Sequence, residues 1–280
     1  MQRSDTGEIE SAAWRGKEEK MGVAHISYLS NTLGFHTNIY VILPVDAQQG
    51  ETEPFCTLYL LHGGGGNALD WLRFTGIEHY AREHHIAVVM PEVGGESFYA
   101  DMKYGYDYFT YMSEELPQVV EYMFPLCAKR EGRLVAGLSM GGYGAFMWAL
   151  RRPDFFRAAA NLSGLSNIVS LFREDREDAF NKEQRQKLVE CVWGSIEELE
   201  GSDADSRLLL EQAAQNRKKI PALFGGIGTE DFTYHNAMEY LETARQLDVP
   251  IHFEEMSGGH EWKVWDEMIQ RFLNWESGRK

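Results

Sequence analysis

Short apolar runs rich in β-branched and aromatic residues recur along this chain, and longer segments with helical periodicity separate most of them. The later runs are almost continuously apolar, which is typical of strands whose two faces are both covered by helices. This order of strand, helix and strand predicts an α/β fold with a mostly parallel, doubly wound sheet and helices on both faces. The predicted strands are residues 23–29, 37–43, 57–61, 86–90, 133–138, 158–162, 222–227 and 251–256.

The first two of these runs lie close together, which indicates an antiparallel pair at the start of the sheet. Helical periodicity falls between and after the later strands. The expected helices include residues 112–124, 143–150, 236–247 and 261–275.

We expect a single domain over residues 21–280, because no repeat, low-complexity tract or Pro/Ser-rich linker interrupts it. Residues 1–20 are polar and mixed in charge, and we expect a disordered extension there. They lack the apolar core of a secretory signal, so export by that route is not expected. Residues 163–219 are longer than a simple crossover and have a helical pattern around residues 182–192. We expect them to form an insertion packed over the end of the sheet that carries the active site.

The charge of the chain narrows its expected partners. It has 27 Lys and Arg against 43 Asp and Glu, a formal net charge of −16. Such a surface repels phosphate backbones and anionic lipid headgroups, so neither nucleic acid nor a membrane is expected as a partner. No run approaches the roughly 20 apolar residues that span a bilayer. A homo-oligomer is left open, because apolar surface cannot be located from sequence.

The cysteines indicate a reducing compartment. Cys56, Cys127 and Cys191 are odd in number, widely spaced and set among apolar neighbours. We expect reduced, buried thiols in a cytoplasmic protein rather than a disulfide framework or a zinc site. Because no P-loop lysine pattern and no H-E-x-x-H motif occurs, no metal and no cofactor is predicted.

The sharpest chemical signal is the segment 137–142, which reads Gly-Leu-Ser-Met-Gly-Gly between a predicted strand and a predicted helix. A serine at such a turn has a strained backbone, which lifts its hydroxyl clear of the sheet. The positions two before and two after the serine face each other closely, and glycine at both avoids a clash. The following helix directs N–H groups and the positive end of its dipole toward the hydroxyl. This context predicts that Ser139 is a nucleophile.

A serine hydroxyl needs a base, so a carboxylate and then a histidine should follow Ser139 in the chain. Nine histidines compete for this role. His260 is the best placed, because it lies in a glycine-containing loop between the last predicted strand and the last predicted helix. His235, at the start of a predicted helix, is the alternative base.

Asp231 is the predicted acid. It follows the apolar strand 222–227, and the loop beyond that strand is where a carboxylate that orients the imidazole should stand. Glu230 could substitute, but neighbouring side chains point apart, so only one of the two can serve. Asp231 could in addition cap the helix expected to begin near Tyr234.

An oxyanion hole is the remaining requirement. Residues 60–67 read Leu-Leu-His-Gly-Gly-Gly-Gly-Asn after the third predicted strand. Glycines let the main chain approach a substrate closely and turn an N–H toward a developing negative charge. We assign the two donors to the backbone N–H groups of Met140 and Gly64, with Gly63 or Gly65 as alternatives to Gly64.

The same glycine-rich loop supports a rival hypothesis. Residues 63–68 fit a dinucleotide-binding fingerprint that ends in alanine, and Glu92 at the end of the next strand could hold a ribose. A nucleotide-dependent oxidoreductase would leave the serine, aspartate and histidine without a role. The hydrolytic interpretation is therefore preferred.

Taken in order, these motifs resemble the "putative esterase" branch of the α/β-hydrolases. That branch includes S-formylglutathione hydrolases, feruloyl and acetyl esterases, and bacterial tributyrin esterases. Within it, the motifs resemble the tributyrin esterase group most. The matching segments are residues 33–44, 62–64, 97–101, 137–142, 228–231 and 258–260. The resemblance runs from about residue 21 to about residue 275. It implies an eight-stranded sheet and a catalytic triad of Ser139, Asp231 and His260.

The resemblance also implies a carboxylesterase that cleaves small acetyl, butyryl or feruloyl-type esters through an acyl-enzyme, without a cofactor. A thioesterase of the S-formylglutathione hydrolase kind is less favoured, because the loop around Gly64 lacks the Leu-Thr-Cys sequence of such enzymes. An acyltransferase or peptidase would share the triad. From a different class, a non-catalytic binding protein with this fold is disfavoured by the presence of all three catalytic side chains.

Several aromatic residues could line an acyl or sugar pocket or could pack in the core or at an interface. They are Phe98, Tyr99, Tyr104, Tyr106 and Trp193.

Overall fold

A computed structural model of the chain describes residues 21–44, 53–173, 182–216 and 219–279. The expectation of a disordered extension at residues 1–20 lies outside the described residues. Within the described part of the chain, no helix has both the length and the apolar character needed to cross a membrane.

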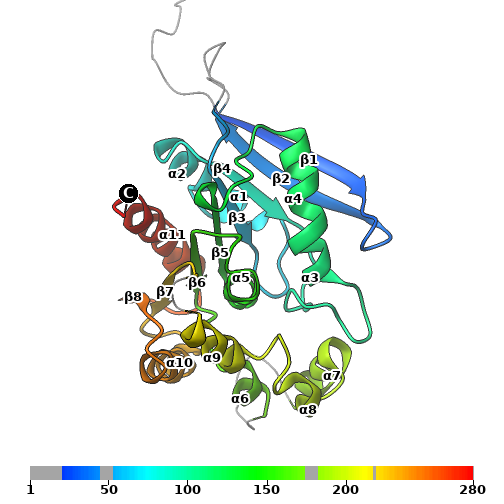
Figure 1. The fold of residues 1–280 in the computed structure, drawn as a ribbon, viewed down its shortest axis with the longest axis vertical. Coiled ribbons are helices and arrows are strands. Elements are labelled where there is room, and N and C mark those ends of the chain that lie inside the picture. Colours follow the sequence, from blue (N-terminus) through cyan, green and yellow to red (C-terminus); the bar gives the residue numbers. More distant parts are fainter. Residues whose placement is uncertain (1–20, 45–52, 174–181, 217–218, 280) are drawn as a thin grey trace, which may run out of the picture.

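One eight-stranded sheet forms the centre of the molecule, in the order β1-β2-β4-β3-β5-β6-β7-β8 (Figure 1). β1 pairs with β2 and β2 with β4 in antiparallel fashion, and all later pairs are parallel. Each predicted strand is present within two residues of its predicted bounds. The strands are β1 (Met21–Leu29), β2 (His36–Pro44), β3 (Thr57–Leu61), β4 (Ala87–Pro91), β5 (Arg133–Leu138), β6 (Ala158–Leu162), β7 (Ala222–Gly228) and β8 (Ile251–Met256).

Helices cover both faces of this sheet, which confirms the predicted doubly wound α/β fold (Figure 1). They are α1 (Asp70–Phe74), α2 (Ile77–Glu83), α3 (Tyr108–Thr110), α4 (Leu116–Met123), α5 (Met140–Arg151), α6 (Ile168–Arg173), α7 (Lys182–Trp193), α8 (Ile196–Leu199), α9 (Ser206–Gln215), α10 (Tyr234–Gln246) and α11 (Trp262–Ser277). A π-helical turn, Tyr111–Glu115, joins α3 to α4, and a 3₁₀ turn, Arg130–Gly132, precedes β5. Pro117 lies in the first turn of α4, where its missing N–H is tolerated.

The alternation of side chains along β3 divides the core into two layers. Leu58 and Leu60 belong to the core layer that includes side chains of α1, α2 and α11, whereas Tyr59 and Leu61 belong to the layer that includes side chains of α4, α5 and α10. Since successive side chains of a strand point to opposite faces, a continuously apolar strand has to be covered twice. The apolar runs of the sequence are therefore explained by burial on both sides.

The four helices α6 to α9 all belong to the segment 163–219 and lie together at the lower edge of Figure 1, beyond α5. α6 and α9 approach each other, and α8 contacts both α6 and α7. That residues 163–219 are an insertion stays a prediction.

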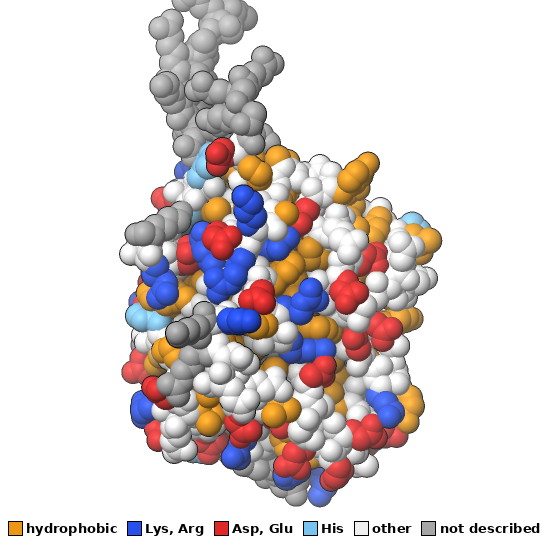
Figure 2. Space-filling model, in the orientation of Figure 1, with side chains coloured by type: hydrophobic (Ala, Val, Ile, Leu, Met, Phe, Trp, Pro, Cys, Tyr) orange, Lys and Arg blue, Asp and Glu red, His pale blue; other side chains and the backbone are white. Residues whose placement is uncertain are grey.

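Figure 2 shows apolar side chains on one face of the molecule only as small, separated areas among charged ones.

The three cysteines are free thiols, but the prediction that they are buried is wrong, because Cys56, Cys127 and Cys191 are each partly exposed. Cys56 and Cys127 lie in segments that precede strands rather than in the strands, and Cys191 faces the loop at Tyr104, whose carbonyl oxygen accepts a bond from its thiol at 3.4 Å.

Candidate active site

Ser139 lies at a sharp turn between β5 and α5. Its φ of 52° and ψ of −119° are strained for any residue with a Cβ atom. A Cβ on Gly137 would overlap the backbone of Gly141, and a Cβ on Gly141 would overlap the carbonyl oxygen of His62. Glycine is therefore required on both sides of the serine, and the serine hydroxyl reaches the pocket above the sheet.

The side chain of His260 lies within hydrogen-bond distance of both other members of the predicted triad. Its Nε2 is 3.0 Å from Ser139 Oγ, and its Nδ1 is 2.9 Å and 3.1 Å from the two carboxylate oxygens of Asp231. A carboxylate only accepts, so Nδ1 carries the proton and donates it, which leaves Nε2 to accept from the serine hydroxyl. Phe232 and Trp265 contact the imidazole, at ring-centroid distances of 4.6 Å and 4.9 Å.

Asp231 is well suited to stay ionised. Its side chain is 0% exposed, and burial alone opposes its charge. Hydrogen bonds from His260 and from the N–H and hydroxyl of Thr233 outweigh that effect and hold the pKa of Asp231 below its ordinary value. Thr233, not Asp231, occupies the position just before α10, so the aspartate stabilises the turn there without being the helix cap.

Glu230 points away from the imidazole and binds the neighbouring loop instead. Its carboxylate accepts from the N–H of Gly258, and its own N–H donates to the Gly258 carbonyl at 3.0 Å. The hydroxyls of Thr229 and Ser257 also donate to it, at 2.9 Å and 3.4 Å. The bond from Gly258 is the main reason that the pKa of Glu230 is lowered. Glu230 thus anchors the loop that presents His260, a contact that sequence reasoning missed.

Glu230→Ala is expected to lower kcat by about tenfold to hundredfold with a smaller change in KM, because small misplacements of a catalytic group are costly. Glu230→Gln keeps an acceptor for the Gly258 N–H and should lose less. Glu255→Gln, which removes the same charge from the end of β8 but not the anchor, is the matched control. Parent kcat in the alanine variant would contradict a positioning role.

The same contact predicts a pH dependence of stability. The folded pKa of Glu230 is lowered, so its ionised form stabilises the folded state at pH values above the ordinary carboxyl pKa of about 4.3. This contribution should be lost as the pH falls through the lowered folded pKa. Urea unfolding of the parent and of Glu230→Gln between pH 7 and pH 3 should show a difference that shrinks toward acid.

The glycine-rich loop after β3 brings its main chain beside the serine. Gly64 and Met140 both line the pocket, and a Cβ on Gly64 would lie 3.9 Å from the Cβ of Met140. The N–H of Gly65 donates to the carbonyl oxygen of Gly95 at 2.7 Å, so it is not free to bind an oxyanion. This removes Gly65 from the candidate oxyanion donors and leaves Gly64, with Gly63 as the remaining alternative.

Buried hydrogen bonds hold that loop in place. The hydroxyl of Tyr99 donates to the carbonyl oxygen of His62 at 2.8 Å, and the indole of Trp71 donates to that of Leu61 at 3.0 Å. Tyr99 is itself buried beneath the loop, so it supports the site rather than lining it. Glu92 accepts from the N–H of Ala68 at 2.9 Å. That carboxylate is engaged in holding the loop, which disfavours the ribose-binding role of the nucleotide hypothesis.

Other sequence candidates lie elsewhere. His235 is on α10, where its side chain is 70% exposed and 3.0 Å from Glu239.

Of the aromatic residues, Phe98 lines the pocket, whereas Trp193 is outside the pocket lining and packs against Phe98 and Phe172. Tyr104 and Tyr106 are exposed and lie outside the pocket lining. In the described parts of the chain, no three His, Cys, Asp or Glu side chains form a group that could hold a metal ion.

The pocket over the serine, named here the catalytic pocket, has a volume of about 400 Å³. Ser139 and His260 form one side of it, and apolar side chains from α6 and the preceding loop form much of the rest, including Leu165, Ile168 and Leu171. A nucleophile, a base with its orienting acid, and N–H groups beside an apolar space are the requirements for acyl transfer from a small ester.

Comparison with known proteins agrees with this geometry. A family model described as "Putative esterase" matches residues 30–275. An acetyl esterase of Caldicellulosiruptor saccharolyticus is 31% identical over 264 residues, which are 92% of this chain and 98% of that protein. The structure of FphF, a fluorophosphonate-binding serine hydrolase of Staphylococcus aureus, has a TM-score of 0.81 and 35% identity, and the match covers 91% of this chain and 98% of the other.

A second structure from Staphylococcus aureus, described as an S-formylglutathione hydrolase (FrmB), has a TM-score of 0.79 and 34% identity over the same shares of the two chains, 91% and 98%. A ferulic acid esterase at 24% identity and a TM-score of 0.70, covering 91% of this chain and 97% of that one, shares the fold.

Proposed function

The chain belongs to the esterase family described as "Putative esterase" in the α/β-hydrolase superfamily and is a serine ester hydrolase, and from this premise we propose that Ser139, His260 and Asp231 are its catalytic residues. The observation that carries the proposal is the unbroken line of contacts from Ser139 Oγ through the His260 ring to the Asp231 carboxylate. This arrangement allows His260 to remove the proton from the Ser139 hydroxyl.

In the acylation step, Ser139 Oγ attacks the ester carbonyl carbon while His260 Nε2 takes the hydroxyl proton. Asp231 stabilises the resulting imidazolium and keeps it oriented, without taking the proton. The carbonyl oxygen becomes an oxyanion, which the N–H groups of Gly64 and Met140 bind. Loss of one such donor costs about 2.7–4 kcal/mol of barrier. The imidazolium then gives its proton to the leaving alcohol as the C–O bond breaks.

Deacylation repeats the sequence with water. His260 removes a proton from a water molecule, the oxygen attacks the acyl carbon, and the same N–H groups bind the second oxyanion. Collapse of that intermediate returns the proton to Ser139 and releases the acid. The triad, the two N–H groups, the ester and one water molecule account for every step.

The substrate class we propose is a small ester with a short acyl or aryl-acyl group. A pocket of about 400 Å³ with an apolar wall suits a small acyl chain, and one relative is named an acetyl esterase. A thioesterase is the second candidate, since another relative is described as an S-formylglutathione hydrolase. The partly exposed free cysteines favour a reducing compartment such as the cytoplasm.

The test is labelling with a fluorophosphonate followed by an ester panel. Stoichiometric modification of Ser139, located by peptide mass spectrometry, is expected, and a protein that only binds ligands would not react. Nitrophenyl acetate, butyrate and octanoate, a feruloyl ester and a short thioester should then rank with the short oxygen esters first. A faster thioester would favour the second candidate.

Phe172→Ala is expected to shift the acyl preference toward longer chains. Phe172 lines the catalytic pocket and also a second cavity of about 660 Å³, so its ring forms part of the wall between the two. Each methylene that gains burial contributes about 0.8 kcal/mol, so the ratio of kcat/KM for octanoate over butyrate should rise about tenfold or more.

Val189→Ala enlarges only the second cavity and is the control for this change. It should leave the preferred chain length where it is in the parent. An unchanged preference in a folded Phe172→Ala variant would show that the ring does not limit the acyl chain.

A further inference from the structure

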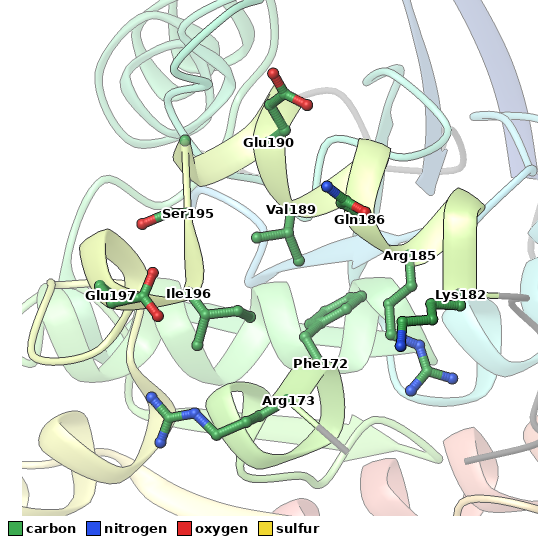
Figure 3. Close-up of a pocket in the computed structure, with 11 residues that line it drawn as sticks. Phe172, Arg173, Lys182, Arg185, Gln186, Val189, Glu190, Ser195, Ile196 and Glu197 are labelled. Atoms are coloured by element: carbon green, nitrogen blue, oxygen red, sulfur yellow. The ribbon is translucent and has the colours of Figure 1, made fainter. Parts of the chain in front are cut away.

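A second cavity, named here the outer cavity, lies among α6, α7 and the start of α8 (Figure 3). Its volume is about 660 Å³, and it shares two lining residues with the catalytic pocket, Phe172 and Arg185. Two cavities bounded by the same two side chains are neighbours. A substrate group longer than the catalytic pocket would therefore meet Phe172 and Arg185 at the junction.

Arg185 is unusual among the residues of this junction. The residue is 6% exposed, and it is the one Lys or Arg among the described residues that line the catalytic pocket. It lines this pocket together with apolar side chains from α6, including Ile168 and Leu171. An arginine this deeply buried is uncommon unless it is paired, and Arg185 has a further interaction within the protein that holds it at the junction.

Positive charge at this point is reinforced along α7. Lys182 lies one turn before Arg185, and Figure 3 shows the two side chains extending from the same side of the helix. Arg173, which also lines the outer cavity, turns away from them in Figure 3 and binds Glu200 at 2.7 Å. Lys182 and Arg185 are thus two cationic side chains on the same side of α7, and Arg185 is the buried one.

A guanidinium has five N–H donors in a planar fork, so it can hold a carboxylate through two bonds while it keeps other contacts. Such charge-assisted bonds are strong where water is excluded. On the basis of the proposed esterase function, we propose that Arg185 binds a carboxylate at the end of the substrate remote from the scissile bond. The preferred substrates are then esters or thioesters with an anionic acyl chain or an anionic leaving group that reaches the outer cavity.

The first test uses the parent enzyme and matched substrates. The acyl arm compares mono(4-nitrophenyl) adipate with its methyl ester, followed through nitrophenolate release. The leaving-group arm compares 3-(4-acetoxyphenyl)propanoate with its methyl ester, followed through acetate release. In at least one arm, kcat/KM for the carboxylate should exceed that for the neutral partner by about tenfold, the effect of one charge-assisted hydrogen bond. The arm that shows the preference identifies which part of the substrate reaches Arg185.

The second test asks whether Arg185 causes that preference. In Arg185→Gln the ratio of kcat/KM for carboxylate over neutral substrate should fall about tenfold, and Arg185→Lys should keep part of it. Lys187→Gln removes the same charge from the same helix at an exposed position and should leave the ratio at the parent value. Thermal unfolding of each variant checks that it is folded.

Three outcomes are distinct. A parent enzyme that prefers the neutral ester in both arms overturns the carboxylate site even if no Arg185 variant folds. A folded Arg185→Gln variant with an unchanged ratio also overturns it. Absence of hydrolysis of every ester, neutral ones included, would instead contradict the proposed function itself.

Discussion

Ser139→Ala is expected to lower kcat for a nitrophenyl ester by about a millionfold, which is the scale seen when the nucleophile of a serine hydrolase is removed. The variant loses the oxygen that forms the acyl-enzyme, while the oxyanion donors and the pocket remain. A residual rate of about 10³–10⁴ over water is therefore expected, because those groups still bind the transition state for direct attack by water.

The stability of this variant should remain close to that of the parent. Ser139 Oγ makes its described hydrogen bond to the part-buried His260, and such a bond is worth only about 1 kcal/mol. Steady-state rates, single-turnover labelling and a thermal unfolding curve on the same preparation separate chemistry from folding. Substantial activity in a folded Ser139→Ala variant would mean that another residue is the nucleophile.

His260→Ala is expected to cost about as much as loss of the serine, since the members of a triad act as a unit. Without the imidazole, the Ser139 hydroxyl keeps its proton and the Asp231 carboxylate remains buried without the base that it orients. The loss should appear in kcat rather than KM, because the imidazole acts on the reacting proton and not on the bound acyl group.

The matched control is His235→Ala, which removes the same side chain from α10. His235 is 70% exposed and pairs with Glu239, an interaction of the kind that contributes about 0.5 kcal/mol or less. Its kcat should stay within about twofold of the parent. Loss of activity in His235→Ala together with survival in His260→Ala would move the base to α10.

Much of the fold was predictable because its signals are local. Residues 134–138 are apolar at every position since both faces of the strand are covered, and the strand appears there as Arg133–Leu138, the predicted bounds. The turn at Ser139 was also predictable, because its Gly-x-Ser-x-Gly pattern is local in the sequence, although the atoms that exclude a Cβ at Gly141 belong to the distant His62. The strands of the structure lie within two residues of their predicted bounds, whereas the prediction that the cysteines are buried is wrong.

Other features had no local signal. Glu230 and Asp231 are neighbouring acids with different partners: Glu230 accepts from the Gly258 backbone, and Asp231 accepts from His260. Only the position of the loop between β8 and α11 decides which of the two carboxylates meets the imidazole. The exclusion of Gly65 as an oxyanion donor depends on the carbonyl of Gly95, thirty residues away along the chain. Nothing in the sequence around Tyr99 indicates that its hydroxyl donates to the His62 carbonyl and so holds the oxyanion loop.

The sequence by itself determined the order of strands and helices, the cramped bend at Ser139 and the type of chemistry, because these depend on neighbouring residues and on which side chains can carry a proton. The tertiary structure alone decided that His260, 121 residues after Ser139, reaches it, and that Arg185 lies between two cavities. Contacts of this kind are set by how helices pack on the sheet, and packing depends on the shapes of many distant side chains at once.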